Sequence, residues 1–243
     1  EPTPVPEGTP TPTRRPSGGG SSGGIRHTPA PTATPAAAVT AEPTAVPEAS
    51  ETPAPTVQSG RFTDVAETDW FFDSVEYTAE KGYFNGTGDG IFEPYTNVTR
   101  GMLVTVLGRL EGISEEPADT VYTDVDSNAY YAAHIAWATE NGIVDGYGNG
   151  LFGPEDLVTR EQMAKMTANY LSYKTGITAG DTSLAYTDAA DISEWAAESV
   201  ALAAQQGIMN GNADGTFAPK SFATRAETAA VIERLDRLLA SQG

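Results

Sequence analysis

Three arginines recur at equivalent places in the chain, and their surroundings could bind an anion. Arg100, Arg160 and Arg225 each follow a threonine, a residue that commonly caps the start of a helix. An arginine at the first helical position faces the positive end of the helix dipole, which costs about 0.3–1 kcal/mol at an exposed site. A bound anion would offset this cost, because the guanidinium and free backbone N–H groups could hold it together. We therefore favour an anion-binding role over a purely structural ion pair.

The threonines have a structural role of their own. Two of the Thr-Arg pairs open a capping box, since 159–162 reads TREQ and 224–227 reads TRAE. The first pair departs from this pattern, because 99–102 reads TRGM. It lacks the capping carboxylate, and its glycine weakens the first helical turn. The capping box explains the threonines but leaves the arginines without an explanation.

The arginines recur because one unit is written three times. Residues 62–102 match 122–162 at a constant offset of 60 without a gap, and a third copy starts at 186. The third copy carries one extra residue between Asp188 and Trp195. Each copy predicts a first helix, such as the one with Val75 and Ala79 on its apolar face. A glycine ends this helix, a loop with two further glycines follows, and the Thr-Arg pair opens a second helix.

We therefore predict a mostly α-helical body of three helix–loop–helix units at 61–115, 121–175 and 185–240. One unit of roughly 55 residues would be marginally stable alone, so we expect the three to pack together. Residues 1–60 hold 13 of the 17 prolines, no aromatic residue and a GGGSSGG block. This composition predicts a disordered linker. The sequence begins at Glu1 without an apolar leader, so we expect any signal peptide to be missing or already removed.

The repeated pattern resembles the S-layer homology (SLH) domain, a module usually present in three copies. The shared features are an F-x-D-V start, as in FTDV at 62–65, a D-G-x-F-x-P loop and an I-T-R-A-E-like helix start. The resemblance implies a pseudo-threefold spindle in which one helix per repeat builds a central bundle. It also implies grooves between neighbouring repeats that hold the secondary cell wall polysaccharide linked to peptidoglycan in Gram-positive bacteria, often through a pyruvylated, anionic sugar.

On this resemblance we expect an extracellular, monomeric anchoring module at the cell wall or S-layer, without catalytic activity or a cofactor. The candidate ligand-binding residues are Arg100, Arg160, Arg225, Asp64, Asp124, Asp188, Trp70, Tyr130, Trp195, Gly86, Gly146 and Gly211. Each has a structural alternative: the aspartates could organise a turn, the aromatics could be core anchors, and the glycines serve the turn in either case. Trp137, in the middle of a helix, is expected to pack in the core.

The three grooves are not expected to be equivalent. Many SLH repeats carry a basic residue between the loop phenylalanine and proline, where this chain has Glu93, Gly153 and Ala218. Glu93 would repel an anionic sugar unless it points away. The second copy also has Tyr130 in place of tryptophan.

Charge excludes some functions. The formal net charge is −19, and no basic stripe is available to neutralise nucleic-acid phosphates. No apolar run reaches the roughly 20 residues that span a bilayer, and the chain has no cysteine for disulfides or zinc. Because the repeats themselves are strongly acidic, binding of an anionic polymer must depend on the local arginines and not on overall charge.

Three alternatives remain from the residues alone. Asp89, Asn149 and Asp214 precede loop glycines and could bind calcium, but one carboxylate per loop favours turn chemistry. An enzyme is disfavoured, because His27 and His134 form no triad or metal cluster, and His134 is expected on a helix surface. A protein-binding helical repeat would need an exposed apolar stripe, and none is evident. The alternative function is thus a calcium-dependent structural or protein-interaction repeat of a surface protein.

Overall fold

The computed structural model describes residues 60–242, so the linker expected at 1–60 lies outside the described residues apart from Gly60. Within this part the structure is helical and contains no strands, which confirms the predicted fold class. The helices are α1 (Phe72–Glu80), α2 (Arg100–Glu111), α3 (Ala132–Glu140), α4 (Arg160–Thr175), α5 (Glu194–Gln205) and α6 (Arg225–Ala240), with a short 3₁₀ helix η1 (Ala189–Asp191) before α5.

The helix ends follow the predicted local signals. Thr99, Thr159 and Thr224 are the N-caps of α2, α4 and α6, and their side chains accept a hydrogen bond from the backbone of the third helical residue. The capping box is complete in α4 and α6 but not in α2. The outer helices α1, α3 and α5 end just before glycines with positive φ, at Gly82, Gly142 and Gly207.

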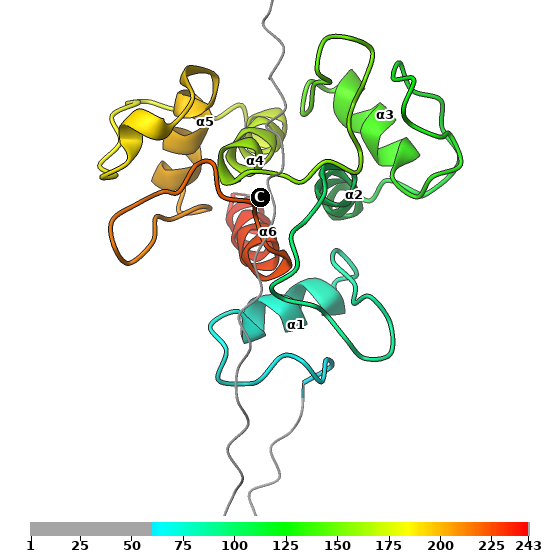
Figure 1. Cartoon of the computed structure of the whole chain (residues 1–243), viewed down its shortest axis with the longest axis horizontal. Helices are drawn as coiled ribbons and strands as arrows, with labels where there is room; N and C mark the ends of the chain where they lie inside the picture. The colour runs from blue at the N-terminus through cyan, green and yellow to red at the C-terminus, as the bar shows by residue number, and fades with distance from the viewer. Residues whose placement is uncertain (1–59, 243) are drawn as a thin grey trace, which may run out of the picture. The chain divides into compact units, whose positions relative to one another are not determined.

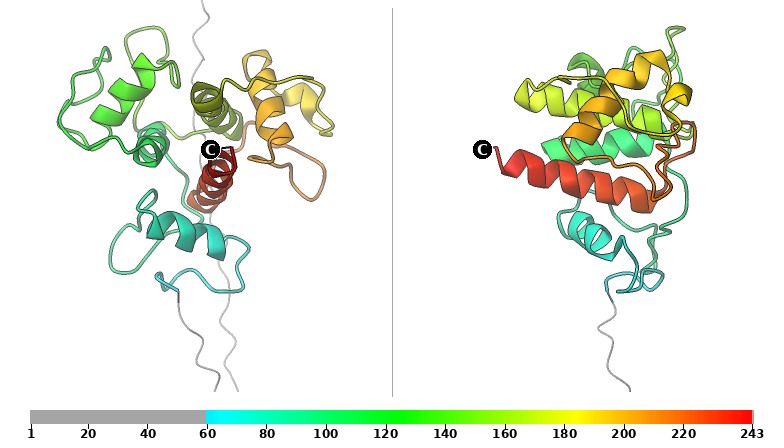
Figure 2. Two further views of the ribbon diagram at one scale, coloured as in Figure 1. Left: turned by 180° about the vertical axis from the view of Figure 1, so that it is seen from behind. Right: turned by 90° about the vertical axis from the view of Figure 1, so that its left-hand side faces the viewer.

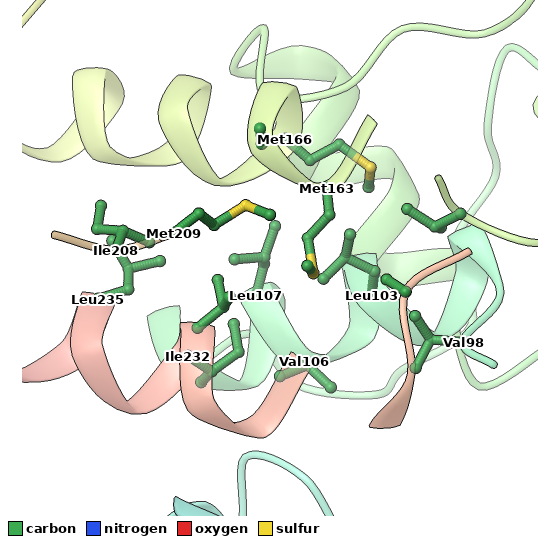
Figure 3. Close-up of a cluster of buried hydrophobic side chains, with 14 of the residues drawn as sticks. Val98, Leu103, Val106, Leu107, Met163, Met166, Ile208, Met209, Ile232 and Leu235 are labelled. Carbon is green, nitrogen blue, oxygen red and sulfur yellow. The ribbon is translucent and has the colours of Figure 1, made fainter. Parts of the chain in front are cut away.

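The second helix of each repeat lies at the centre of the domain. Helices α2, α4 and α6 all contact one another, and Figure 1 shows them together inside a ring of the three outer helices. The core between them is built from branched aliphatic side chains and methionines. Those labelled in Figure 3 are Val98, Leu103, Val106, Leu107, Met163, Met166, Ile208, Met209, Ile232 and Leu235. The central bundle implied by the resemblance is thus confirmed.

Each outer helix packs on a central helix from a different repeat. α3 packs on α2, α5 packs on α4, and α1 packs on α6, as the views from two sides show (Figure 2). The first and last helices of the domain therefore meet, and the three repeats close into a ring.

A ring of three backbone hydrogen bonds joins the segments that lead into the central helices. The N–H of Val98 donates to the Ala223 carbonyl at 2.9 Å, Ala223 donates to Val158 at 2.9 Å, and Val158 donates back to Val98 at 3.0 Å. These bonds fix the starts of α2, α4 and α6 against one another, so each Thr-Arg pair has a defined position.

Two expectations about single residues turn out differently. His134 is fully buried in the α3–α2 contact, so the expectation that it lies on a helix surface is wrong. Trp137 is partly buried and packs against the core, where its ring contacts those of Tyr170 and Tyr173. No helix within residues 60–242 is long and apolar enough to cross a membrane.

Candidate functional site

The three arginines tie the start of each central helix to the glycine loop of another repeat. Arg100 donates from Nε to the Phe152 carbonyl at 2.9 Å and from Nη2 to the Asp145 carbonyl at 2.8 Å. The other two arginines bond to the equivalent carbonyls: Arg160 to Phe217 and Asn210, and Arg225 to Phe92 and Asn85. All three are buried, with 6%, 7% and 3% of their surface exposed. Each guanidinium therefore stabilises the contact between two repeats.

The arginines also lie over aromatic rings. The guanidinium carbon of Arg100 lies 4.5 Å from the centre of the Phe152 ring and 5.0 Å from that of Tyr147. Burial lowers the pKa of Arg100, against the opposing influence of Tyr147 and nearby aspartates. A guanidinium nevertheless stays protonated in proteins, so the site keeps its positive charge at neutral pH.

The backbone N–H groups at the helix starts are not available to an anion, which corrects one part of the sequence interpretation. In α2 the N–H of Arg100 donates to the Asp156 carbonyl at 2.9 Å, and that of Gly101 donates to Pro154 at 2.8 Å. The third N–H of the helix donates to the capping threonine. The same pattern holds at the starts of α4 and α6. These donors are used in joining the repeats, so an anion would have to bind through side chains.

The three repeated aspartates hold the exits of the glycine loops. The two carboxylate oxygens of Asp124 accept the N–H groups of Phe152 and Gly153 at 2.8 and 2.7 Å. Asp64 and Asp188 bind the equivalent pairs of N–H groups. Partial burial would raise the pKa of Asp124, but these backbone donors outweigh it and the pKa lies below its ordinary value. The same balance lowers the pKa of Asp188. Both oxygens are therefore occupied within the protein.

The repeated aromatics are exposed and are not core anchors. Trp70, Tyr130 and Trp195 have 64%, 46% and 52% of their surface exposed. In the first copy the anchoring role belongs to the next residue, because Phe71 is buried. The Trp70 ring stands at right angles to that of Phe71, with centroids 5.3 Å apart. An exposed aromatic ring that is fixed by contact with a buried ring is suited to stacking on the C–H face of a sugar.

The repeated loop glycines are needed because an aromatic ring lies against the backbone. A methyl group at Gly86, Gly146 or Gly211 would collide with the ring that opens the same repeat, Phe62, Tyr122 or Tyr186, and with a loop carbonyl. These glycines do not have positive φ, so close approach and not turn conformation fixes their identity.

Two of these aromatics border clefts that also contain a repeated arginine. The first cleft, here called the Trp70 groove, has a volume of about 170 Å³. It brings together one residue of the first repeat, a central-helix arginine, the third glycine loop and one face of α6. The lining residues are Trp70, Arg160, Met209, Asn210, Gly211, Asn212, Glu227, Ala230, Val231 and Arg234.

The second cleft, the Trp195 groove, is built in the same way from the other repeats and has a volume of about 450 Å³. Its residues are Trp195, Arg100, Ile143, Asp145, Gly146, Tyr147, Gln162, Lys165, Met166 and Asn169. Each groove thus combines an arginine, an aromatic and a loop glycine that the sequence singled out, together with groups from three repeats.

Tyr130 and Arg225 stand at the equivalent place between the remaining repeats. Burial raises the pKa of Tyr130, and the positive charges of Arg109 and Arg225 act against this shift. Asp64 does not line either of the two grooves; it borders a separate shallow depression with Glu93 and Tyr95.

Sequence reasoning missed the groove residues on the central helices. Gln162, Lys165, Met166 and Asn169 line one face of α4, as their equivalents do on α6. Their spacing of three and four residues is the signal that could have found them, because it places polar side chains on one face of a helix that is otherwise buried.

The loop residues considered for calcium form turns. Asp214 Oδ1 accepts the N–H and the hydroxyl of Thr216 at 3.0 and 2.7 Å, and Asn149 Oδ1 accepts the N–H of Leu151 at 3.2 Å. Across residues 60–242, no three His, Asp or Glu side chains come close enough together to hold a metal ion.

The three repeats match a known protein family. The family described as the S-layer homology domain matches residues 61–101, 121–164 and 185–229. These segments include the repeated aspartates, exposed aromatics, loop glycines and arginines described above.

The relatives are longer proteins with different names. The chain is 35% identical over 182 residues to the exoglucanase XynX of Acetivibrio thermocellus, covering 72% of this chain and 16% of the relative. It is 27% identical over 186 residues to an S-layer protein of Bacillus thuringiensis subsp. finitimus, covering 76% and 22%. It is 29% identical over 157 residues to a cellulosome-anchoring protein of A. thermocellus, covering 63% and 35%. The chain thus spans well under half the length of each.

Proposed function

Because the chain belongs to the S-layer homology domain family, we propose that residues 60–242 are a non-catalytic module that anchors its protein to a bacterial cell surface. The names of an S-layer protein and a cellulosome-anchoring protein among its relatives support this proposal. The match to the exoglucanase takes up 16% of that relative, which leaves most of its chain for the activity in its name. The expected location is extracellular, at the wall of a Gram-positive-type bacterium.

The ligand that fits the grooves best is the secondary cell wall polysaccharide, in the form that carries anionic, pyruvylated sugars. The observation that carries this proposal is the pairing of an exposed tryptophan with a buried arginine in one cleft, seen for Trp70 with Arg160 and for Trp195 with Arg100. The ring can cover the apolar face of a sugar, and the arginine can meet a carboxylate. We expect one protein molecule to act as a monomer with several grooves.

The test is co-sedimentation of the intact chain with purified cell walls. We expect binding to walls that retain their polysaccharide and none to walls from which acid has removed it. Equal binding to both preparations would contradict the proposal. Addition of EDTA should leave binding unchanged. Loss of binding would instead favour the alternative, a calcium-dependent repeat.

Tryptophan substitutions make this test specific to the grooves. Trp70→Ala and Trp195→Ala together should weaken wall binding about tenfold or more, since each aromatic contact contributes roughly 0.5–1.5 kcal/mol. Folding should be unaffected, because both side chains are exposed. The matched control is Tyr173→Ala, an exposed aromatic on α4 that lines neither groove. If this control binds as poorly as the double variant, the grooves are not the site.

A further inference from the structure

The two grooves hold their arginines in different electrostatic states. In the Trp70 groove, Nη1 of Arg160 forms an ion pair of 2.6 Å with Oε1 of Glu227. In the Trp195 groove, Arg100 uses Nε and Nη2 on backbone carbonyls. Among residues 60–242 no carboxylate lies within ion-pair distance of Arg100 or of the neighbouring Lys165. One arginine is thus already satisfied by a carboxylate, and the other is not.

A single position on the central helix accounts for this difference. Glu227 and Gln162 are the third residues of α6 and α4, and both complete a capping box. Oε2 of Glu227 accepts the Thr224 N–H at 2.9 Å, while its other oxygen binds Arg160. Oε1 of Gln162 accepts the Thr159 N–H at 3.0 Å. The cap therefore needs an oxygen at this position, but it does not need the charge.

Net charge alone does not separate the grooves. The Trp70 groove contains Arg234 besides the Arg160–Glu227 pair, and the Trp195 groove contains Asp145 besides Arg100 and Lys165. Each groove therefore carries the same formal charge. The grooves differ in pairing and in space. Within residues 60–242, the Trp195 groove offers two cations without an ion-pair partner, Arg100 and Lys165, in about 450 Å³, whereas the Trp70 groove offers one, Arg234, in about 170 Å³.

We propose that the Trp195 groove is the one that accepts the anionic sugar, and that residue 162 or 227 decides whether a groove does so. This inference rests on the proposed function. In the Trp70 groove an anionic sugar reaches Arg160 only by separating it from Glu227, and it then meets the carboxylate of Glu227; among the residues that the structure describes, Arg234 is the one cation there without an ion pair. A carboxylate in the Trp195 groove can approach Arg100 and Lys165 without separating an ion pair, and the uncharged Gln162 does not repel it. At the third equivalent position α2 has Met102, which supplies neither charge nor cap, but there the carboxylate of Glu93 acts on Arg225 and would oppose an anionic sugar.

A reciprocal exchange tests this inference with matched variants. Gln162→Glu should convert the Trp195 groove to the state of the other, and Glu227→Gln should release Arg160. The probe is the methyl glycoside of a pyruvylated hexose, with the same glycoside lacking pyruvate as the neutral control. Isothermal titration calorimetry gives the affinity and the number of sites. Both variants keep a residue that completes the capping box, so both should fold; E227Q also removes the ion pair to the buried Arg160, so its melting temperature should be the lower of the two.

The parent chain should bind the pyruvylated probe at one strong site. Q162E should weaken this site about tenfold or more, because the new carboxylate would pair with Arg100 and repel the anionic sugar. E227Q should add a second strong site, and Trp70→Ala in the E227Q background should remove it again. Two equal sites in the parent chain, or an affinity unaffected by Q162E, would overturn the inference while leaving wall anchoring intact. A parent chain that binds neither walls nor probe would instead contradict the proposed function.

Discussion

At the scale of single residues, one position in the contact between outer and central helices is filled by a different pair of residues in each of the three contacts. The residues at this contact differ in size and polarity between the three equivalent places. They are Ser74 with Glu233, His134 with Gly108, and Ser199 with Ala168. In the first of these the serine hydroxyl donates to the glutamate at 2.6 Å. In the second, neither ring nitrogen of His134 has a hydrogen-bond partner in the described part of the chain.

We predict that His134 and Gly108 depend on each other. A methyl group at residue 108 would collide with the imidazole ring, so Gly108→Ala should lower the free energy of unfolding by about 1–3 kcal/mol. His134→Ser in the same chain should restore most of the loss, because serine and alanine are the pair found at 199 and 168. Urea denaturation of the four chains of this cycle measures the coupling. Strictly additive effects would contradict the prediction.

The same variants should also differ in how their free energy of unfolding depends on pH. Burial lowers the pKa of His134, although Glu115 acts in the opposite direction. The unfolded chain, with a pKa of about 6.5 for histidine, therefore takes up a proton at a higher pH than the folded chain does. The contribution of the neutral, buried ring to stability is therefore fully present above the pKa of the unfolded chain and is lost as the pH falls below that value. His134→Ser should reduce the loss of stability between about pH 7.5 and 5.5.

At the scale of the elements, features set by neighbouring residues could be predicted from the sequence. Thr159 caps the start of α4 and Gly142 follows the end of α3, because capping and positive φ are decided within a few residues. The position of His134 could not be predicted in this way. Its helix has nine residues, and the face that is buried depends on the small residue opposite, which belongs to another repeat.

The arginines show the same limit within the candidate site. Their recurrence and type could be read from the repeats, but their acceptors could not. Arg225 bonds to the carbonyls of Phe92 and Asn85, which lie 133 and 140 residues earlier in the chain. No local pattern connects residues at such distances. For the same reason the sequence identifies Glu227 as a cap of its own helix and not as the ion-pair partner of Arg160.

We predict that the arginines are required for folding as well as for any ligand. Arg225→Lys keeps the charge but cannot donate to two separate carbonyls with the planar geometry of a guanidinium. It should lower the free energy of unfolding by about 1–3 kcal/mol without any ligand present, because a buried carbonyl loses its donor. Thermal denaturation followed by circular dichroism measures this. The control is Lys81→Ala, an exposed residue at the end of α1, which should leave the transition unchanged.

At the scale of the whole domain, the first repeat is joined to the last. α1 packs on α6, where Tyr77 donates to Asp236 at 2.8 Å. Arg225 and the ring of backbone bonds through Val98 and Ala223 make the same connection at the other end of α6. In a linear array of repeats each unit contacts its neighbours and can open separately. A closed ring has no terminal unit, so loss of one contact removes support from both of its neighbours.

This closure predicts that the domain unfolds in one transition. The chain has one tryptophan in each repeat, Trp70, Trp137 and Trp195, so three variants that each keep a single tryptophan report on the three repeats separately. Val75 of α1 is fully buried, and Val75→Ala should cost about 2 kcal/mol. If the ring is cooperative, urea midpoints seen by all three reporters coincide and move by the same amount. If the repeats were independent, the midpoint of the Trp70 reporter would move and that of the Trp195 reporter would stay. Because α6 contacts α1, α2 and α4, we expect the shared shift.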